Sequence, residues 1–107
     1  SSPGSRFVRA CFCKMNSICE GDDASSIAQF FHILDAVSIV RGEVLLQDNK
    51  CSATTYTCCA NATQGIYYYR SYANSQLTGV RLTEENKNRK SLSIFPMEER
   101  QQIRFLN

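Results

Sequence analysis

Six cysteines carry the most evident chemistry in this sequence: Cys11, Cys13, Cys19, Cys51, Cys58 and Cys59. A structural zinc site would need two cysteine pairs, each with about two to four residues between its members, and these spacings do not fit it. A thioredoxin-like couple would need a C-x-x-C pair, and the sequence has none. An even number of cysteines in a short chain instead predicts three disulfides and an oxidising compartment.

The segment RACFCKM contains Cys11 and Cys13. Its β-branched and aromatic content predicts a strand over residues 6–15, on which both thiols share a face. We expect both to be oxidised, not to each other, and at least one to reach the cysteines after residue 50. The connectivity stays open, because six cysteines allow about 15 pairings. Each bridge would contribute roughly 3–4 kcal/mol, so reduction is predicted to unfold the protein.

His32, the only histidine, lies three residues before Asp35. A histidine oriented by a carboxylate can act as a general base, and Glu84 or Glu98 could complete a hydrolase or ribonuclease-like site. However, His32 flanks apolar helical residues, and each glutamate adjoins a second acid on a polar segment, which favours a solvated surface. We therefore predict no catalytic residue, no metal site and no cofactor, and keep the small hydrolase as an alternative.

A candidate contact face is formed by Tyr67, Tyr69, Arg70 and Tyr72. Tyrosine and arginine are enriched at the centres of binding interfaces, because they combine a large contact area with hydrogen-bonding groups. A strand over 65–72 would place Tyr67 and Tyr69 on one face and Arg70 and Tyr72 on the other. Some of these rings must then be core, and the choice between core and contact stays open.

One amphipathic helix is predicted over Asp23–Val37, with apolar residues at helical spacing and acids at its start. Its cap is either Asp22, Asp23 or a capping box formed by Ser26 and Gln29. β-Forming residues follow over 37–46, around a turn at Arg41-Gly42.

Further along the chain, two β-prone segments over 53–59 and 65–72 predict a hairpin whose loop carries the sequon Asn61-Ala62-Thr63, so we expect glycosylation at Asn61. Weaker signals predict strands over 80–82 and 91–95. The tail is predicted to begin with a helical turn at Pro96 and to return to alternation at 103–105.

These elements predict an α+β fold: a small disulfide-stabilised antiparallel sheet with one main amphipathic helix packed on it, in an α/β sandwich. A mostly β domain with one helix is the alternative. We predict that residues 1–5 are a disordered N-terminal segment and that residues 6–107 form a single disulfide-rich domain.

Charge and hydropathy exclude some classes of function. The net charge is only +2, with acids gathered in the first half of the chain, so we expect no nucleic-acid partner. No apolar run approaches the roughly 20 residues of a membrane span. The chain shows no leader sequence, so we take it as the mature form of a secreted protein.

The layout resembles small secreted cysteine-rich proteins of fungi, including effectors and the killer-toxin-like group. ACFCK, the helix Asp23–Val37, and Cys51 with the Cys58-Cys59 pair carry the resemblance. It implies a secreted, extracellular, non-enzymatic interaction protein, an effector or toxin-like module that binds a host or target protein or glycan. A membrane-active toxin is a further alternative, with a membrane partner considered less favoured because the apolar helix stripe is needed for the core. The oligomeric state is left open.

Overall fold

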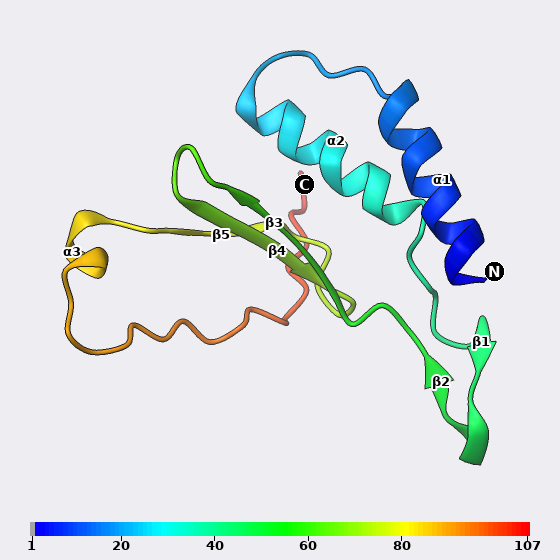
Figure 1. Cartoon of the computed structure of the whole chain (residues 1–107). Helices are drawn as coiled ribbons and strands as arrows, with labels where there is room; N and C mark the ends of the chain where they lie inside the picture. The colour runs from blue at the N-terminus through cyan, green and yellow to red at the C-terminus, as the bar shows by residue number, and fades with distance from the viewer. Residues whose placement is uncertain (1) are drawn as a thin grey trace. The chain divides into compact units, whose positions relative to one another are not determined.

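The computed structural model describes residues 2–107, and Ser1 lies outside the described residues. The chain divides into two compact units, one up to Thr54 and one from Thr55 to Asn107 (Figure 1). The prediction that residues 6–107 form a single domain stays a prediction.

Helix α1 (Pro3–Asn16) begins the first unit, and the predicted strand over 6–15 is therefore wrong. Ser2 is the N-cap: its side-chain oxygen accepts from the Ser5 amide at 3.1 Å, and Pro3 occupies the first turn, where its missing N–H costs nothing. Pro3, Gly4 and Ser5, which were predicted to be disordered, belong to this helix.

Helix α2 (Asp23–Asp35) lies within the predicted helical segment. Asp22, one of the alternative caps, accepts from the Ser25 amide at 2.8 Å. Phe31 is the only residue of α2 that is fully buried, at 2% exposed. The helix pair is joined to the following segment by Arg6, whose Nε donates to the Val37 carbonyl at 2.9 Å.

The capping bond of Asp22 predicts a pH effect on α2. Hydrogen bonds from Ser25 hold the pKa of Asp22 below its ordinary value of 3.8. A lowered folded-state pKa gives stability that is present above pH 3.8 and is lost as the pH falls through the lowered value. We expect Asp22→Ala to reduce helical content at neutral pH by far-UV circular dichroism. Asp22→Asn should keep the cap and lose its acid dependence; equal helicity in the Ala and parent chains would contradict the assignment.

The rest of the first unit is a short ribbon. Strands β1 (Val44–Leu45) and β2 (Cys51–Ser52) pair antiparallel around the 3-10 turn η1 (Gln47–Asn49). The predicted strand over 37–46 is thus reduced to two residues. No helix within residues 2–107 is long and apolar enough to cross a membrane.

The second unit contains an antiparallel sheet of order β3-β4-β5, with β3 (Tyr56–Asn61), β4 (Ile66–Ser71) and β5 (Thr78–Arg81). The predicted hairpin is present, and Gly65 closes its turn with a φ of 70° that favours glycine. Strand β5 begins earlier than the predicted strand over 80–82.

A short helix, α3 (Glu84–Lys87), follows β5, and the chain then continues to residue 107 without a helix or strand within the part that the structure describes (Figure 1). The strand predicted over 91–95, the helical turn at Pro96 and the alternation at 103–105 are therefore absent from this structure. Their apolar side chains are exposed, because these residues have no strand partner here.

All six cysteines are free thiols: Cys11, Cys13, Cys19, Cys51, Cys58 and Cys59. The predicted disulfide-stabilised sheet with one main helix is wrong on two counts, because no bridge holds the sheet and a second long helix occupies residues 3–16. On a helix, Cys11 and Cys13 do not share a face as they would on a strand. The argument from disulfides for an oxidising compartment no longer applies, and secretion stays a prediction.

Candidate functional site

One face of the β3-β4-β5 sheet gathers aromatic side chains, and we call it the tyrosine face. The register pairs Tyr56 with Ser71, Cys58 with Tyr69, Ala60 with Tyr67, Tyr67 with Val80, and Tyr69 with Thr78, so these residues share a face. The rings of Tyr67 and Tyr69 lie 6.3 Å apart between centroids. On the β3 edge, Tyr56, Cys58 and Ala60 are exposed.

Tyr69 and Asn74 tie the C-terminal segment to this sheet. Tyr69, 7% exposed, accepts from the Glu98 amide through its hydroxyl at 2.8 Å. Asn74, 1% exposed, donates from Nδ2 to the Glu98 carbonyl at 3.2 Å and accepts at Oδ1 from the Gln76 amide. One buried amide thus fixes both the β4–β5 connection and the passage of the tail across the sheet.

Tyr67 and Cys58 form a hydrogen-bonded pair on the tyrosine face. This hydrogen bond, together with partial burial and neighbouring groups, raises the pKa of Tyr67 from 10.0 to about 12. The rise in pKa means that the protonated phenol is the donor. The pair therefore stabilises the fold below pH 10, and this contribution is lost as the pH rises through about 12.

Cys58→Ala is expected to lower the pKa of Tyr67 from about 12 toward 10, because the acceptor sulfur is removed. Tyrosinate absorbance during alkaline titration measures this, with Tyr67→Phe identifying the transition. Cys59→Ala is the matched control, since Cys59 lies on the opposite face of the same strand. An unchanged titration in Cys58→Ala would refute the pairing.

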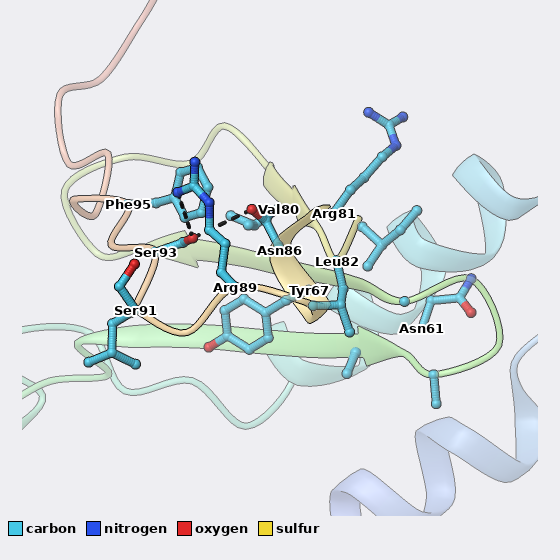
Figure 2. A pocket seen from close by; sticks show the side chains of 15 residues that line it. Asn61, Tyr67, Val80, Arg81, Leu82, Asn86, Arg89, Ser91, Ser93 and Phe95 are labelled. Atoms are coloured by element: carbon cyan, nitrogen blue, oxygen red, sulfur yellow. Dashed lines mark hydrogen bonds between the residues drawn. The ribbon is translucent and has the colours of Figure 1, made fainter. Parts of the chain in front are cut away.

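A pocket of about 660 Å³ opens beside Tyr67. Its walls are the ends of β3, β4 and β5, helix α3 and the segment 91–95 (Figure 2). Ala60, Tyr67, Val80, Leu82, Leu92 and Phe95 make its lining largely apolar.

Arg89 makes the polar contacts on one side of this pocket. Its guanidinium pairs with Glu85 at 3.5 Å and donates to Ser93 at 3.4 Å, and Ser93 in turn donates to Asn86 (Figure 2). These long contacts leave the guanidinium about half exposed. The arrangement orders α3 against the segment 91–95 and offers no nucleophile paired with a base.

The residues that the sequence suggested for catalysis belong to different units. His32 lies in the first unit on α2, with Nδ1 4.0 Å from Asp35 and a side chain 75% exposed. Glu84 and Glu98 lie in the second unit. Glu84 pairs with Lys87 at 2.9 Å, and Glu98 uses its backbone for the contacts with the sheet. The predicted surface role of these acids agrees with this geometry.

The residues of the predicted contact face do not lie on one face of the sheet. Tyr67 and Tyr69 belong to the tyrosine face, whereas Arg70 lies on the other face and donates to Thr57 Oγ1 at 3.4 Å. Tyr72 follows the end of β4 and is 43% exposed. Sequence reasoning missed Asn74, although an asparagine between two strands is a turn signal.

Asn61, the predicted glycosylation site, ends β3 and is partly exposed, with its side-chain oxygen accepting from the Gln64 amide at 3.1 Å. Glycosylation stays a prediction. Across residues 2–107, no group of three or more histidine, cysteine, aspartate or glutamate side chains could hold a metal ion.

Comparison with protein families gives a match over most of the chain. Residues 1–95 match the family of linear amide C–N hydrolases, choloylglycine hydrolase family. A bile salt hydrolase/transferase of Lactiplantibacillus plantarum is 39% identical over 96% of this chain and 32% of its own length. The bile salt hydrolase/transferase of Clostridium perfringens is 32% identical over 99% of this chain.

Solved structures agree with these matches. Crystal structures of two variants of the conjugated bile acid hydrolase from Clostridium perfringens resemble this chain with a TM-score of 0.88, at 32% identity and over 99% of the chain. The chain spans about a third of the length of the relatives it matches, at 32%.

Two sequence predictions are corrected by these matches. The resemblance to fungal effectors and killer-toxin-like proteins is wrong, because the family that matches is a family of amide hydrolases. The prediction of a non-enzymatic effector or toxin-like module is wrong for the same reason, and the hydrolase alternative fits better. That resemblance depends on a disulfide framework, and these cysteines form no bridges.

Proposed function

The chain belongs to the choloylglycine hydrolase family of linear amide C–N hydrolases, and on this basis we propose that it forms part of an enzyme that hydrolyses conjugated bile acids. The observation that carries the proposal is the family match over residues 1–95 together with 39% identity to a bile salt hydrolase/transferase. The chain corresponds to about a third of such a protein, so its role is proposed as a part of the whole enzyme.

The proposed reaction breaks one amide C–N bond. Water supplies a hydroxyl group to the acyl carbon and a proton to the leaving nitrogen, so choloylglycine and water give cholate and glycine. A conjugated bile acid combines a large apolar body with a small anionic group. An enzyme for it needs apolar walls and a rigid scaffold that positions the amide.

The described residues suit a scaffold role in such an enzyme. Two helices and a three-stranded antiparallel sheet are ordered by buried contacts at Phe31, Tyr69 and Asn74. Neither His32 nor Glu84 is held in a nucleophile–base pair within the part of the chain described here. In this proposal, the two helices and the sheet help to frame the active site.

Transfer of the acyl group to an amine other than the glycine is a second proposed activity. The names of the relatives from Lactiplantibacillus plantarum and Clostridium perfringens include both hydrolase and transferase. In transfer, the amine nitrogen replaces water as the attacking group and a new amide is formed, so both activities share the breaking of the same bond.

Replacement of the matching segment in the Lactiplantibacillus plantarum relative by this chain tests the proposal. We expect the chimera to release glycine from choloylglycine, with the parent enzyme as positive control and the relative lacking the segment as negative control. The chimera is first checked for folding by gel filtration and circular dichroism. A folded chimera without activity would contradict the proposed function.

A further inference from the structure

The pocket beside Tyr67 is large enough for a small organic ligand. Its volume of about 660 Å³ lies within the roughly 300–1,000 Å³ that is typical of small-molecule sites. All the residues that line it, from Ala60 to Phe95, belong to the second unit. The second unit therefore contains the whole pocket.

The apolar walls of this pocket are accessible to a ligand. Tyr67 on β4 is 43% exposed, Leu82 directly after β5 is 56% exposed, and Phe95 in the segment 91–95 is 59% exposed. A ligand that covers these side chains removes apolar surface from water, which is favourable. The walls therefore favour a ligand with a compact apolar body.

The charged side chains that line the pocket are both cations. Arg81 and Arg89 line it, and no aspartate or glutamate within residues 2–107 does so. Arg81 is exposed at the end of β5. Arg89 follows α3, and its guanidinium lies beside Ser93 (Figure 2). Because the lining carries charge of one sign, it favours an anionic group on the ligand.

Arg89 has hydrogen-bond donors available for such a group. Its Nη2 lies 3.5 Å from Glu85 Oε1, and its Nη1 donates to Ser93 Oγ at 3.4 Å. Charge-assisted hydrogen bonds are ordinarily about 2.7–2.9 Å long, so both contacts are weak. The side chain of Arg89 is 49% exposed, and a guanidinium carries several N–H groups in one plane. A ligand carboxylate can therefore form a planar pair with Arg89, in place of its single long contact with Glu85.

We propose that this pocket binds an amphipathic carboxylate, with the apolar body against Tyr67, Leu82 and Phe95 and the carboxylate paired with Arg89. No covalent bond is made or broken at this site. The proposal rests on the volume, the apolar walls and the cationic lining of the pocket, and it does not depend on the proposed function. Fatty acids and free bile acids share this chemistry, so one of each is used as a probe.

Equilibrium dialysis of the whole chain against labelled decanoate, and separately against labelled cholate, measures the binding. Both probes are kept below their micelle concentrations. Decanol is the control ligand, because it has the carbon chain of decanoate without the charge. We expect one saturable site per chain for at least one carboxylate, and binding of decanol at least about tenfold weaker than that of decanoate. Decanoate binding alone would identify a fatty-acid site, and cholate binding alone a bile-acid site.

Changes at Arg89 and Glu85 are expected to shift the affinity in opposite directions. Arg89→Gln should weaken binding of the carboxylate by at least about tenfold and leave decanol binding unchanged. Glu85→Gln removes the competing carboxylate and should strengthen binding by about two- to fivefold, a gain that misfolding could not produce. Arg104→Gln is the matched control, because Arg104 is an exposed arginine of the second unit that does not line the pocket.

The proposal would be overturned by the absence of saturable binding for both carboxylates, by decanol binding as tightly as decanoate, or by equal losses in Arg89→Gln and Arg104→Gln. Glu85→Gln binding no more tightly than the parent chain would also refute it. The same dialysis is carried out on the chimera with the Lactiplantibacillus plantarum relative, and a folded chimera without the Arg89-dependent site would overturn the proposal. A chimera that keeps this site but releases no glycine from choloylglycine would contradict the proposed function and leave the binding site intact.

Discussion

Phe31→Ala is expected to destabilise the chain by about 3–5 kcal/mol, because a phenylalanine at 2% exposure leaves a large cavity when truncated. Small domains have total stabilities of about 5–15 kcal/mol, so this one change removes a large share. Urea unfolding followed by far-UV circular dichroism measures it. With a slope of about 2 kcal/mol per molar urea, the midpoint should fall by roughly 2 M.

Phe30→Ala is the matched control for this prediction. Phe30 precedes Phe31 on α2 and contacts it edge to face, with centroids 6.0 Å apart, but it is 42% exposed. Its truncation should cost clearly less than that of Phe31. Equal losses for the two variants would show that burial at position 31 does not anchor the fold.

Asn74→Asp is the second large expected effect. The exchange replaces the Nδ2 donor by a carboxylate oxygen that faces the Glu98 carbonyl at a buried position. Loss of a buried hydrogen bond costs about 1–3 kcal/mol, and a buried charge adds to this cost. We expect loss of stability and faster hydrogen exchange over residues 96–101 at neutral pH.

Acid should partly reverse the effect of Asn74→Asp, because a protonated carboxyl group can again donate to the carbonyl of Glu98. Burial raises the pKa of such a carboxyl group, so the recovery begins above the ordinary aspartate range. Glu98→Ala is the control, since it retains the backbone carbonyl that accepts from Asn74. Fast exchange over 96–101 in the control, or slow exchange in Asn74→Asp, would contradict the assigned role.

Local sequence patterns predicted helix α2 and the β3–β4 hairpin. The helix over Asp23–Val37 has a strong apolar period and an acidic cap, and the hairpin over 53–72 has two β-prone runs around a loop that carries the sequon. Both are stabilised by contacts close in sequence, such as the pairing of Cys59 with Tyr68. Such contacts leave a signal in a single sequence.

Other features needed information that the patterns did not carry. Helix α1 was not predicted, because the β-branched and aromatic residues in 6–15 favoured a strand. Ser2-Pro3 is a helix-start signal, but residues 1–5 were predicted to be disordered. The disulfides were inferred from the even number of cysteines, and that count does not reveal whether any two thiols meet. The strand predicted over 91–95 and the alternation predicted at 103–105 are absent, because a strand forms only where a partner is present.

The patterns in this single sequence did not predict the function. The family match extends over residues 1–95. His32, Glu84 and Glu85 are exposed, and each lies within 4.0 Å of an oppositely charged side chain three or four residues away. Asn74 and Tyr69, which organise the sheet, look like ordinary turn and strand residues in the sequence.

Product analysis in water enriched in heavy oxygen tests the central claim most directly. The chimera of this chain with the Lactiplantibacillus plantarum relative is given choloylglycine, and both products are measured by mass spectrometry. Amide hydrolysis predicts glycine and cholate in equal amounts, with one heavy oxygen in the cholate carboxylate. A folded chimera that releases no glycine, or that releases it without heavy oxygen entering cholate, would contradict the account.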